Sequence, residues 1–399
     1  MINSKNYFTK ILLGVLILSL VILIVFTRSS FAIYGASTDL INKWFQIILL
    51  MLVGVSMIFK NYTAQLLVFF LFGLCISFTS FYVTKDKTIL NILLIMFFFS
   101  SYSKKTVVKS FLVVNILSFA IIIISNKLGL LSSVFVQNGS FSSIKNSLGF
   151  IHPNTLGITL LIINLLLVYL YREKLKVWHV LGINFINLYF YHFSGARTSM
   201  ALIILTYIMW ALFKYSTVML LTPGKLVLAY SILILLLFFF SYYSSMSSSL
   251  FVTKTFLSHL DELLTGRLTL GNMFIQEYGI NLVGHQVSFS SLDNLIYSTG
   301  NNYRILDNSY LKLLINYGLI VSISYIFLNI ATVYKSIKTE NDFWILIPFT
   351  IFAFIGFSEQ SMLYFWVNFT FFFTNTVFFD DNGGNAEMGD ERHYREKIR

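Results

Sequence analysis

Long apolar runs alternate with short polar or charged stretches along nearly the whole chain. A helix that crosses the hydrocarbon core of a bilayer needs roughly 20 mostly apolar residues, and the runs recur near that length. They lack the alternation of polar and apolar residues that marks the strands of a membrane β-barrel. The pattern therefore predicts an all-α, polytopic transmembrane helical bundle of about twelve spans. The expected spans are residues 11–26, 44–59, 63–83, 88–102, 107–125, 156–171, 177–193, 198–213, 225–243, 309–334, 343–357 and 361–379.

The composition agrees with lipid as the solvent of most of the chain. Hydrophobic residues make up 57% of the 399 residues and charged residues 11%, and the mean hydropathy is +0.77. A soluble domain is about half apolar and about a quarter charged. The single cysteine, Cys75, lies inside an apolar run, so a disulfide framework and a thiolate metal cluster are excluded.

The net charge of +11 arises from basic residues scattered between the apolar runs. Because they form no contiguous patch, we expect no nucleic-acid partner. Basic side chains gather instead in the cytoplasmic loops of membrane proteins. With a cytoplasmic N-terminus, the cytoplasmic connections carry Lys60, Lys104, Lys105, Arg172, Lys174, Lys176, Lys214, Lys225, Lys335 and Lys338. The opposite connections carry Arg28, Lys43, Lys85, Lys87, Lys127, Lys145 and Arg197.

This modest bias predicts a multi-pass protein with both termini in the cytoplasm. Residues 1–379 are expected to form one membrane domain, with a long extracytoplasmic loop over 244–306. Residues 380–399 are polar and of mixed charge, and they are expected to form a cytoplasmic tail. The orientation places four polar segments on the outer face, at 126–155, 194–197, 244–306 and 358–360. They indicate a working surface, although a bundle must also place its loops somewhere.

The first candidate segment lies where the span near 156–171 begins. Pro153 is favourable in the first turn of a helix, and Asn154 or Thr155 can cap it. The free backbone N–H groups of such a helix start can bind an anion. In the alternative interpretation, this is a plain helix start and His152 is an interfacial polar residue.

Two arginines lie at the ends of apolar runs. Arg197 stands in a very short turn between two such runs, so its charge cannot move far from the membrane. Its planar guanidinium suits phosphate, and the alternatives are an interfacial anchor or a structural salt bridge. Arg267 lies within 256–278, whose apolar spacing suggests an amphipathic helix at the membrane surface or, alternatively, a solvated loop.

Two carboxylates complete the candidate chemistry. Asp307 can cap the span that follows it, and it can also accept a proton from a sugar hydroxyl. Glu359 lies in a short turn with apolar sequence on both sides, which makes it either a site residue or the partner of an arginine. The sequence has no phosphate-binding P-loop, no His/Cys metal-ligand cluster and no nucleophile elbow. We therefore predict no bound metal.

Several short motifs resemble, in their order and spacing over some 170 residues, those of the Wzy-type polysaccharide polymerases of the O-antigen ligase/polymerase superfamily. The ligases of that superfamily carry a histidine at the position of Asp307, while Asn308, Leu311 and Gly318 keep the ligase spacing. This departure favours a polymerase over a ligase. The residues that carry the resemblance are Gly149, Phe150, His152, Pro153, Asn154 and Gly157, then Ser194, Gly195, Arg197 and Thr198, then Gly266 and Arg267, then Asp307, Asn308, Ser309, Tyr310 and Leu311, and finally Asn316, Tyr317 and Gly318.

The resemblance implies a glycosyltransferase of the bacterial cytoplasmic membrane. Such an enzyme moves a growing glycan from undecaprenyl diphosphate to the non-reducing end of a lipid-linked repeat unit, at the outer face. The product is a capsule, an exopolysaccharide or an O-antigen. The implied partners are undecaprenyl-diphosphate-linked oligosaccharides, membrane lipids, a flippase and a chain-length regulator, and no cofactor or metal is implied.

The resemblance and the residue chemistry together assign expected roles. The base that takes the acceptor proton is expected to be Asp307, then Glu359, then His152 in order of preference. Arg197 and Arg267 are expected to bind the diphosphate in place of a metal. Further substrate contacts are expected from Asn154, His285, Asn308 and Tyr310.

Three alternatives remain at this point. A flippase or transporter of lipid-linked oligosaccharide shares the span number, but it should show repeated halves and polar residues near the bilayer midplane. A ligase-like glycan transferase differs in its acceptor. A structural membrane scaffold explains the spans but leaves the order of the motifs without a reason.

Overall fold

The chain is nearly all-α in the computed structural model, which describes residues 2–34, 38–59, 62–100, 102–137, 144–216, 222–247, 256–289 and 304–377. The predicted tail at 380–399 lies outside the described residues. The long α-helices are α1 (Ile2–Arg28), α2 (Thr38–Phe59), α3 (Ala64–Thr84), α5 (Lys104–Lys127), α6 (Pro153–Tyr171), α7 (Val177–Ser194), α8 (Arg197–Tyr215), α9 (Pro223–Met246) and α14 (Gly318–Glu340). The shorter α-helices are α4 (Thr88–Phe99), α10 (Phe256–Leu263), α11 (Arg267–Tyr278), α13 (Ser309–Lys312) and α15 (Leu346–Ser358).

Eight helical segments of the described residues are long and apolar enough to cross a membrane. They are Tyr7–Arg28, Thr38–Phe59, Ala64–Thr84, Lys104–Lys127, Pro153–Tyr171, Arg197–Tyr215, Pro223–Met246 and Ser309–Glu340. Two further expected spans, 88–102 and 343–357, correspond to apolar helices of fewer than 18 residues. The expected span at 177–193 is helical as α7 but is not among the eight. A multi-pass membrane protein is thus supported, and the total of about twelve spans stays a prediction.

The expected helix over 361–379 is wrong as an α-helix. This segment forms two 3₁₀ turns, η6 (Gln360–Leu363) and η7 (Phe369–Val377). Asn368 interrupts the backbone pattern, because its side chain donates to the carbonyl of Met362 at 2.9 Å and accepts from the N–H of Thr370 at 3.1 Å. Such local bonds compete with a continuous helical ladder. The segment is nevertheless deeply buried, so it fills the bundle from inside.

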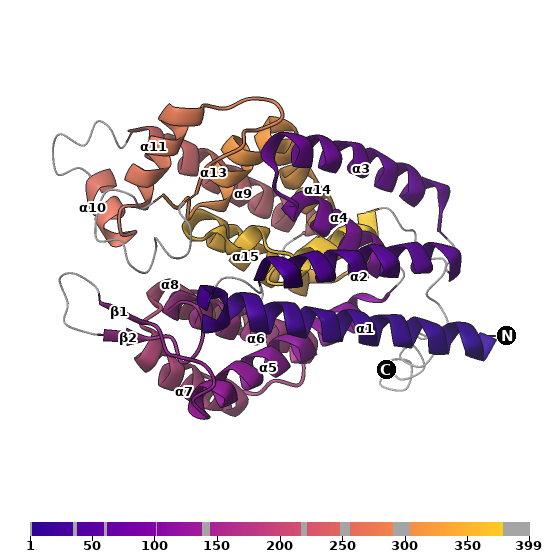
Figure 1. Ribbon diagram of the computed structural model, residues 1–399, viewed down its shortest axis with the longest axis horizontal. Coiled ribbons are helices and arrows are strands. Elements are labelled where there is room, and N and C mark those ends of the chain that lie inside the picture. Colours follow the sequence, from indigo (N-terminus) through magenta and orange to yellow (C-terminus); the bar gives the residue numbers. More distant parts are fainter. Residues whose placement is uncertain are drawn as a thin grey trace.

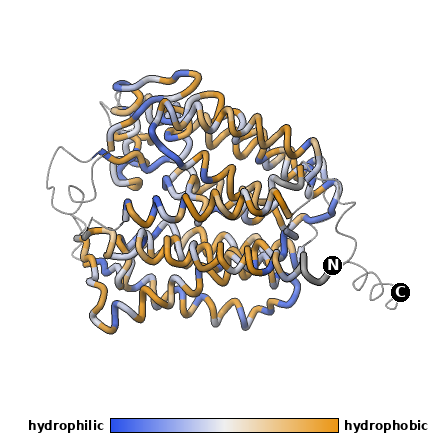
Figure 2. The backbone as a smooth tube through the Cα atoms, turned by 45° about the vertical axis from the view of Figure 1, so that its right-hand side comes forward, coloured by the Kyte–Doolittle hydropathy of each residue, from blue (hydrophilic) through white to orange (hydrophobic). Residues whose placement is uncertain are grey.

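The helices pack as a bundle (Figure 1). Some of the packing contacts join helices that are adjacent in the sequence, and others join helices that are far apart in it. α1 packs on α2 and α5, α6 packs on α5 and α8, and α9 packs on α11, α14 and α15. The tube in Figure 2 is hydrophobic along the middle of the helices and hydrophilic mainly near their ends, as a bilayer environment requires. Buried polar side chains within the bundle find partners: Asn164 and Asn187 exchange hydrogen bonds at 3.0 Å, and Tyr207 donates to Asn164 at 2.6 Å.

One end of the bundle carries the irregular structure. The strands β1 (Phe135–Gln137) and β2 (Ile144–Asn146) form an antiparallel hairpin there, a small departure from the expected all-α fold. Figure 1 places this hairpin, α10 and α11 at the end opposite the start of α1. The amphipathic helix expected over 256–278 is in fact two helices, because Thr265 and Gly266 between α10 and α11 have positive φ angles of 59° and 81°.

A π-helical segment, η4 (Leu313–Tyr317), lies between α13 and α14. A loop that follows α11 docks directly on it. The N–H of His285 donates to the carbonyls of Ile315 and Asn316, each at 3.1 Å. Gly284 lies so close that a Cβ atom added to it would be 2.0 Å from the carbonyl oxygen of Asn316. The wide π-turn thus exposes carbonyl groups to the loop, and Gly284 allows the backbone of the loop to approach them closely.

This fit predicts that Gly284→Ala destabilises the protein more than Gly279→Ala. Both glycines have positive φ, +87° and +67°, so alanine is strained at either position, but a Cβ at Gly279 meets nothing within 4 Å. The strain alone costs about 1–2 kcal/mol, whereas at Gly284 the backbone must also move apart. Thermal unfolding of the purified protein in detergent measures the difference. Equal losses in melting temperature would show that the loop does not dock as described.

Candidate functional site

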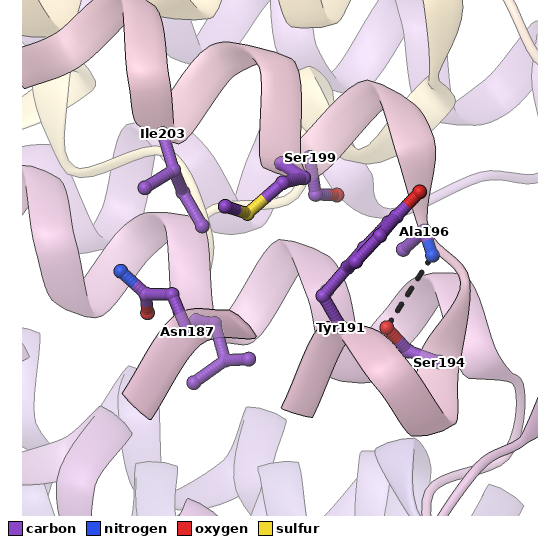
Figure 3. A pocket seen from close by; sticks show the side chains of 9 residues that line it. Asn187, Tyr191, Ser194, Ala196, Ser199 and Ile203 are labelled. Atoms are coloured by element: carbon purple, nitrogen blue, oxygen red, sulfur yellow. Dashed lines mark hydrogen bonds between the residues drawn. The ribbon is translucent and has the colours of Figure 1, made fainter. Parts of the chain in front are cut away.

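The turn between α7 and α8 sets the position of Arg197. Gly195 ends α7 in a left-handed conformation with φ of 54°, and its N–H donates to the carbonyl of Tyr191. The hydroxyl of Ser194 then accepts from the N–H of Ala196 at 3.3 Å, which Figure 3 shows as a dashed line. Arg197 is the first residue of α8 and is exposed. Within the described part of the chain its guanidinium makes no hydrogen bond or ion pair.

Lys145 of β2 lies beside Arg197. Its aliphatic stem crosses over Gly195, where an added Cβ would be 3.0 Å from Lys145 Cε. Partial burial and the nearby charge of Arg197 lower the pKa of Lys145. Neither cation has a carboxylate partner among the described residues. Two adjacent cations without an acidic neighbour repel each other unless an anion binds between them, so the pair is suited to an anionic ligand.

His152 caps the N-terminus of α6, and this corrects the expected cap at Asn154 or Thr155. His152 Nδ1 accepts the backbone N–H of Asn154 at 3.1 Å. The surrounding protein, Lys145 and Arg267 together lower the pKa of His152 to about 4, although the side chain is exposed. The ring is therefore neutral near pH 7 and its proton is assigned to Nε2 from the bond that Nδ1 makes. In this arrangement His152 is a hydrogen-bond donor, so the structure does not favour it as a base.

Close helix packing brings the starts of α6 and α8 together. A Cβ added at Gly157 would lie 2.4 Å from that of Ala196 and 3.0 Å from Ser199 Oγ. Only a glycine therefore permits this approach of the two helices. Because Gly157 allows this contact, the start of α6 with His152 lies close to the turn that holds Arg197.

Arg267 is held by the break between α10 and α11. Asp261 of α10 accepts the backbone N–H of Leu268 at 2.7 Å and the hydroxyl of Thr269 at 2.5 Å. A carboxylate at this position also complements the partial positive charge of a helix start. Asp261 therefore fixes the first turn of α11, in which Arg267 is the first residue.

The guanidinium of Arg267 connects three segments. Its Nη2 lies 3.0 Å from Glu359 Oε1 and 3.7 Å from Asp307 Oδ2. Its Nη1 donates to the carbonyl of Ser358. The side chains are only 13–21% exposed, so this ion-pair cluster of Arg267, Asp307 and Glu359 is largely sealed from water. The expectation that Glu359 is either a site residue or an arginine partner is thus met by its pairing with Arg267.

Burial raises the pKa of both carboxyl groups in this cluster. It raises the pKa of Glu359 to about 7, against the opposing effect of Arg267 and with a further rise caused by Asp307. It also raises the pKa of Asp307, against the opposing charges of Arg267 and Lys312. Among the described residues, Arg267 is the one cation within ion-pair distance of these two close carboxylates, so the second negative charge is disfavoured. A proton can therefore reside in this cluster near neutral pH.

Asp307 does not cap the following helix, contrary to expectation. Asn308 is the cap, because its Oδ1 accepts the N–H groups of Tyr310 and Leu311 at 3.0 and 3.1 Å. The carboxylate of Asp307 faces Arg267 instead. Asn308 is 4% exposed, and Tyr310 is fully buried with its hydroxyl donating to the carbonyl of Ala353 at 2.8 Å. Both expected substrate contacts therefore occupy packing positions in this structure.

The other two expected contacts are placed differently. Asn154 is half-buried in the first turn of α6, and its backbone binds His152. His285 lies against Tyr278, with ring centroids 6.2 Å apart, and its Nε2 is buried without a hydrogen-bond partner. No contact of the described residues joins His285 to Arg267.

Sequence reasoning counted Arg28 and Lys145 only as outward charges. Arg28 ends α1, and its carbonyl accepts the N–H of Ile151 at 2.9 Å, next to His152. Its guanidinium lies 4.7 Å from the ring centroid of Tyr364, near enough to Glu359 for their charges to interact. An arginine at the end of an apolar run is the signal that identified Arg197, and it applies equally to Arg28. No comparable sequence signal marks Lys145.

A small recess, partly open to its surroundings, lies between α6, α7 and α8 beside the turn of Arg197, and the space inside it is about 10 Å³. Figure 3 shows Asn187, Tyr191 and Ser199 around it. This is room for about one water molecule, whereas sites for small molecules are usually roughly 300 Å³ or more. We therefore assign no substrate to this recess.

No group of three His, Cys, Asp or Glu side chains suited to a metal ion occurs among the residues that the structure describes, and the expected absence of a metal stays a prediction. Comparison of the chain with protein-family models, curated proteins and solved structures gave no match. The polymerase resemblance therefore remains a hypothesis from the motifs.

The raised pKa of Glu359 predicts a pH-dependent stability. Between pH 4.5, its ordinary pKa, and about 7, the folded state binds more protons than the unfolded chain, so stability falls as the pH rises through this window. The contribution is on the order of 3 kcal/mol, since one unit equals about 1.4 kcal/mol. The melting temperature should fall less from pH ~5 to ~8 in Glu359→Gln than in the wild type.

The matched control is Glu262→Gln, because Glu262 is exposed on α10. Its pH profile should follow that of the wild type. A Glu359→Gln profile identical to the wild type would show that Glu359 keeps an ordinary pKa.

Proposed function

We propose that this chain is a membrane glycosyltransferase that polymerises lipid-diphosphate-linked saccharides at one end of its helical bundle. The observation that carries the proposal is that the basic residues at this end are of two kinds, some without and one with acidic partners. Lys145 and Arg197 have no acidic partner in the described residues, while Arg267 is paired with two buried carboxylates. The first arrangement suits a diphosphate and the second suits proton transfer. The motif order of the polysaccharide polymerases agrees with both.

The diphosphate of the donor binds, in this proposal, to Arg197 and Lys145. The Nε2–H of neutral His152 supplies a further donor, and Lys145 and Arg267 both lie near enough to that ring to affect its pKa. Positive groups fixed in place before the reaction stabilise the charge that grows on the leaving diphosphate. Arg267 connects this region to the carboxylates, because its charge acts on His152 and its guanidinium pairs with Asp307.

The reaction is a displacement at the anomeric carbon of the donor sugar. An acceptor hydroxyl loses its proton to a carboxylate and forms the new C–O bond. The bond from the anomeric carbon to the diphosphate oxygen breaks, and its electron pair leaves with undecaprenyl diphosphate. The proton then passes from the carboxylate to solvent or to the departing diphosphate, which restores the enzyme.

Asp307 is the preferred base. Its carboxylate has only the 3.7 Å contact with Arg267, whereas Glu359 is hydrogen-bonded to that guanidinium at 3.0 Å. Burial raises the pKa of Asp307, and a carboxylate with a raised pKa is a stronger base. Glu359 is then the positioning residue that holds Arg267, and His152 is a donor to phosphate.

The position of these groups at a bundle end suits substrates with polyprenyl tails, because the tails stay in the bilayer while the sugars react outside it. The proposed location is the outer face of the bacterial cytoplasmic membrane. A flippase would supply the lipid-linked repeat units, and a chain-length regulator would act on the product. The reaction as written uses no nucleotide sugar.

Arg197→Ala is expected to lower polymer formation on the order of 100-fold, the scale of losing one stabilising group in a transition state. Single repeat units should then accumulate on their lipid carrier in the producing cells. Gel analysis of extracted glycan gives the measurement, with protein abundance checked by immunoblot. Lys105→Ala, an exposed lysine at the opposite end of the bundle, should leave the polymer unchanged.

The location of the accumulated units separates this function from that of a flippase. With a defective polymerase they are exposed on the outer face, where an impermeant glycosidase cleaves them in spheroplasts. Units protected from the glycosidase would indicate transport instead, and full-length polymer from Arg197→Ala would remove the phosphate role.

Asp307→Asn should reduce turnover about 100-fold or more in a reconstituted reaction with purified lipid-linked repeat unit, because the amide cannot take the acceptor proton. Binding of undecaprenyl diphosphate should be retained, since Asp307 is not among the cations that hold it. Product ladders and equilibrium binding are measured on the same preparation. Undiminished turnover would assign the base to another residue.

A further inference from the structure

A second set of polar groups lies on the other side of Glu359. The guanidinium of Arg28 is 4.7 Å from the ring centroid of Tyr364 and 5.5 Å from that of Trp366. The two rings are themselves stacked, 5.1 Å apart with an angle of 12° between their planes. Lys312 Nζ approaches the ring centroid of Tyr364 at 5.9 Å. We call Arg28, Tyr364 and Trp366 the aromatic–arginine site.

Two polar atoms of this site are buried without a hydrogen-bond partner among the described residues. They are Arg28 Nη2, at the end of α1, and Trp366 Nε1, which follows η6. A buried polar group without a partner costs about as much as a lost hydrogen bond, and most native structures contain few. Both atoms are hydrogen-bond donors and belong to side chains in contact with each other, so this place is suited to acceptor oxygens from a ligand.

The site is open enough to be reached. Arg28, Tyr364 and Trp366 are each only partly buried. Arg28 has no ion pair among the described residues, and Glu359, its nearest acidic influence, is engaged by Arg267. The guanidinium is therefore stacked on aromatic rings and free to donate to a ligand.

Flat aromatic faces beside fixed donors suit a sugar ring. The electron-rich face of an aromatic ring attracts the polarised C–H bonds on one side of a pyranose, while the donors bind its hydroxyl oxygens. A bare phosphate would leave the aromatic faces unused. The chemistry of the aromatic–arginine site thus favours a saccharide over a simple anion.

We infer that the aromatic–arginine site binds a sugar residue of the acceptor saccharide and presents its hydroxyl to the carboxylates of Asp307 and Glu359. This inference rests on the proposed function and extends it by separating two subsites. Lys145 and Arg197 take the donor diphosphate, and Arg28 with Tyr364 and Trp366 takes the acceptor glycan. Arg267 lies between the two subsites, since its charge acts on His152 and pairs with Glu359.

The test uses the full-length protein in lipid nanodiscs and two probes. One is the repeat-unit oligosaccharide released from its lipid by mild acid, and the other is undecaprenyl diphosphate without sugar. Arg28→Gln and Trp366→Phe should each weaken oligosaccharide binding about tenfold or more, the loss expected for a hydrogen bond in a desolvated site. Both variants should keep wild-type affinity for undecaprenyl diphosphate.

The control variant is Trp178→Phe, because Trp178 is 79% exposed on α7. It should bind both probes like the wild type. Trp366→Phe keeps an aromatic ring and removes only the indole N–H, so it tests the site even if Arg28→Gln does not fold. Thermal unfolding of each variant confirms that the folded protein is being measured.

Three results would overturn the subsite. The wild type fails to bind the oligosaccharide, both variants bind it normally, or both lose undecaprenyl diphosphate instead, which would make this a phosphate site. Failure of the proposed function looks different. The wild type would then bind the oligosaccharide through Arg28 and Trp366 and yet form no product ladder from purified lipid-linked repeat unit.

Discussion

The partly buried ion-pair cluster of Arg267 with Glu359 and Asp307 is the constraint on which the irregular end of the bundle depends. Charges removed from water are stable only when they are paired and hydrogen-bonded. Arg267 comes from α11, Asp307 precedes α13, and Glu359 follows α15. All three segments must therefore meet before both carboxylates lie within ion-pair distance of Arg267. The cluster fixes the meeting point of segments that hydrophobic packing alone would allow to slide.

The basic residues of this end divide into two kinds. Arg267 is engaged by protein carboxylates and a carbonyl, so its position is already determined. Among the described residues, Lys145 and Arg197 have no acidic partner, and Arg28 is stacked on aromatic rings without an acid within ion-pair distance. Positive charge that the protein leaves uncompensated costs stability. Such groups are therefore the ones with free energy to gain from a negatively charged or oxygen-rich ligand.

Much of the fold and part of the site were predictable from residue types at the ends of apolar runs. Such positions identified Arg197 and Glu359, because a charge close to the bilayer needs a reason to be there. Which charges pair could not be predicted, since Arg267 and its partner Glu359 are 92 positions apart along the chain. Lys145 was missed for the same reason, as its neighbour Arg197 lies in another part of the sequence.

In both cases the helix cap was predicted one to three residues away from its position in the structure. His152 caps where Asn154 or Thr155 was expected, and Asn308 caps in place of Asp307. Several neighbouring polar side chains can each serve as a cap, and the backbone angle at the helix start selects among them. The prediction of the last helix was wrong because the side chain of Asn368 bonds to the backbone of a turn. The periodicity of apolar residues does not reveal such a turn. Apolar runs predict the membrane helices even where neighbouring polar side chains compete for the same backbone groups. They do not predict which of those side chains takes a given role.

The π-helical segment Leu313–Tyr317 has a further consequence for how this end could have changed over time. A π-turn corresponds to one residue inserted into an α-helix, and one residue rotates a helix by about 100°. The insertion therefore sets the facing of α13, with Asn308 before it, independently of the facing of α14. The surface that α14 presents to its surroundings can remain as it is while α13 turns. A single-residue insertion or deletion here would thus rotate α13 and the residues before it relative to α14, without changing the facing of α14.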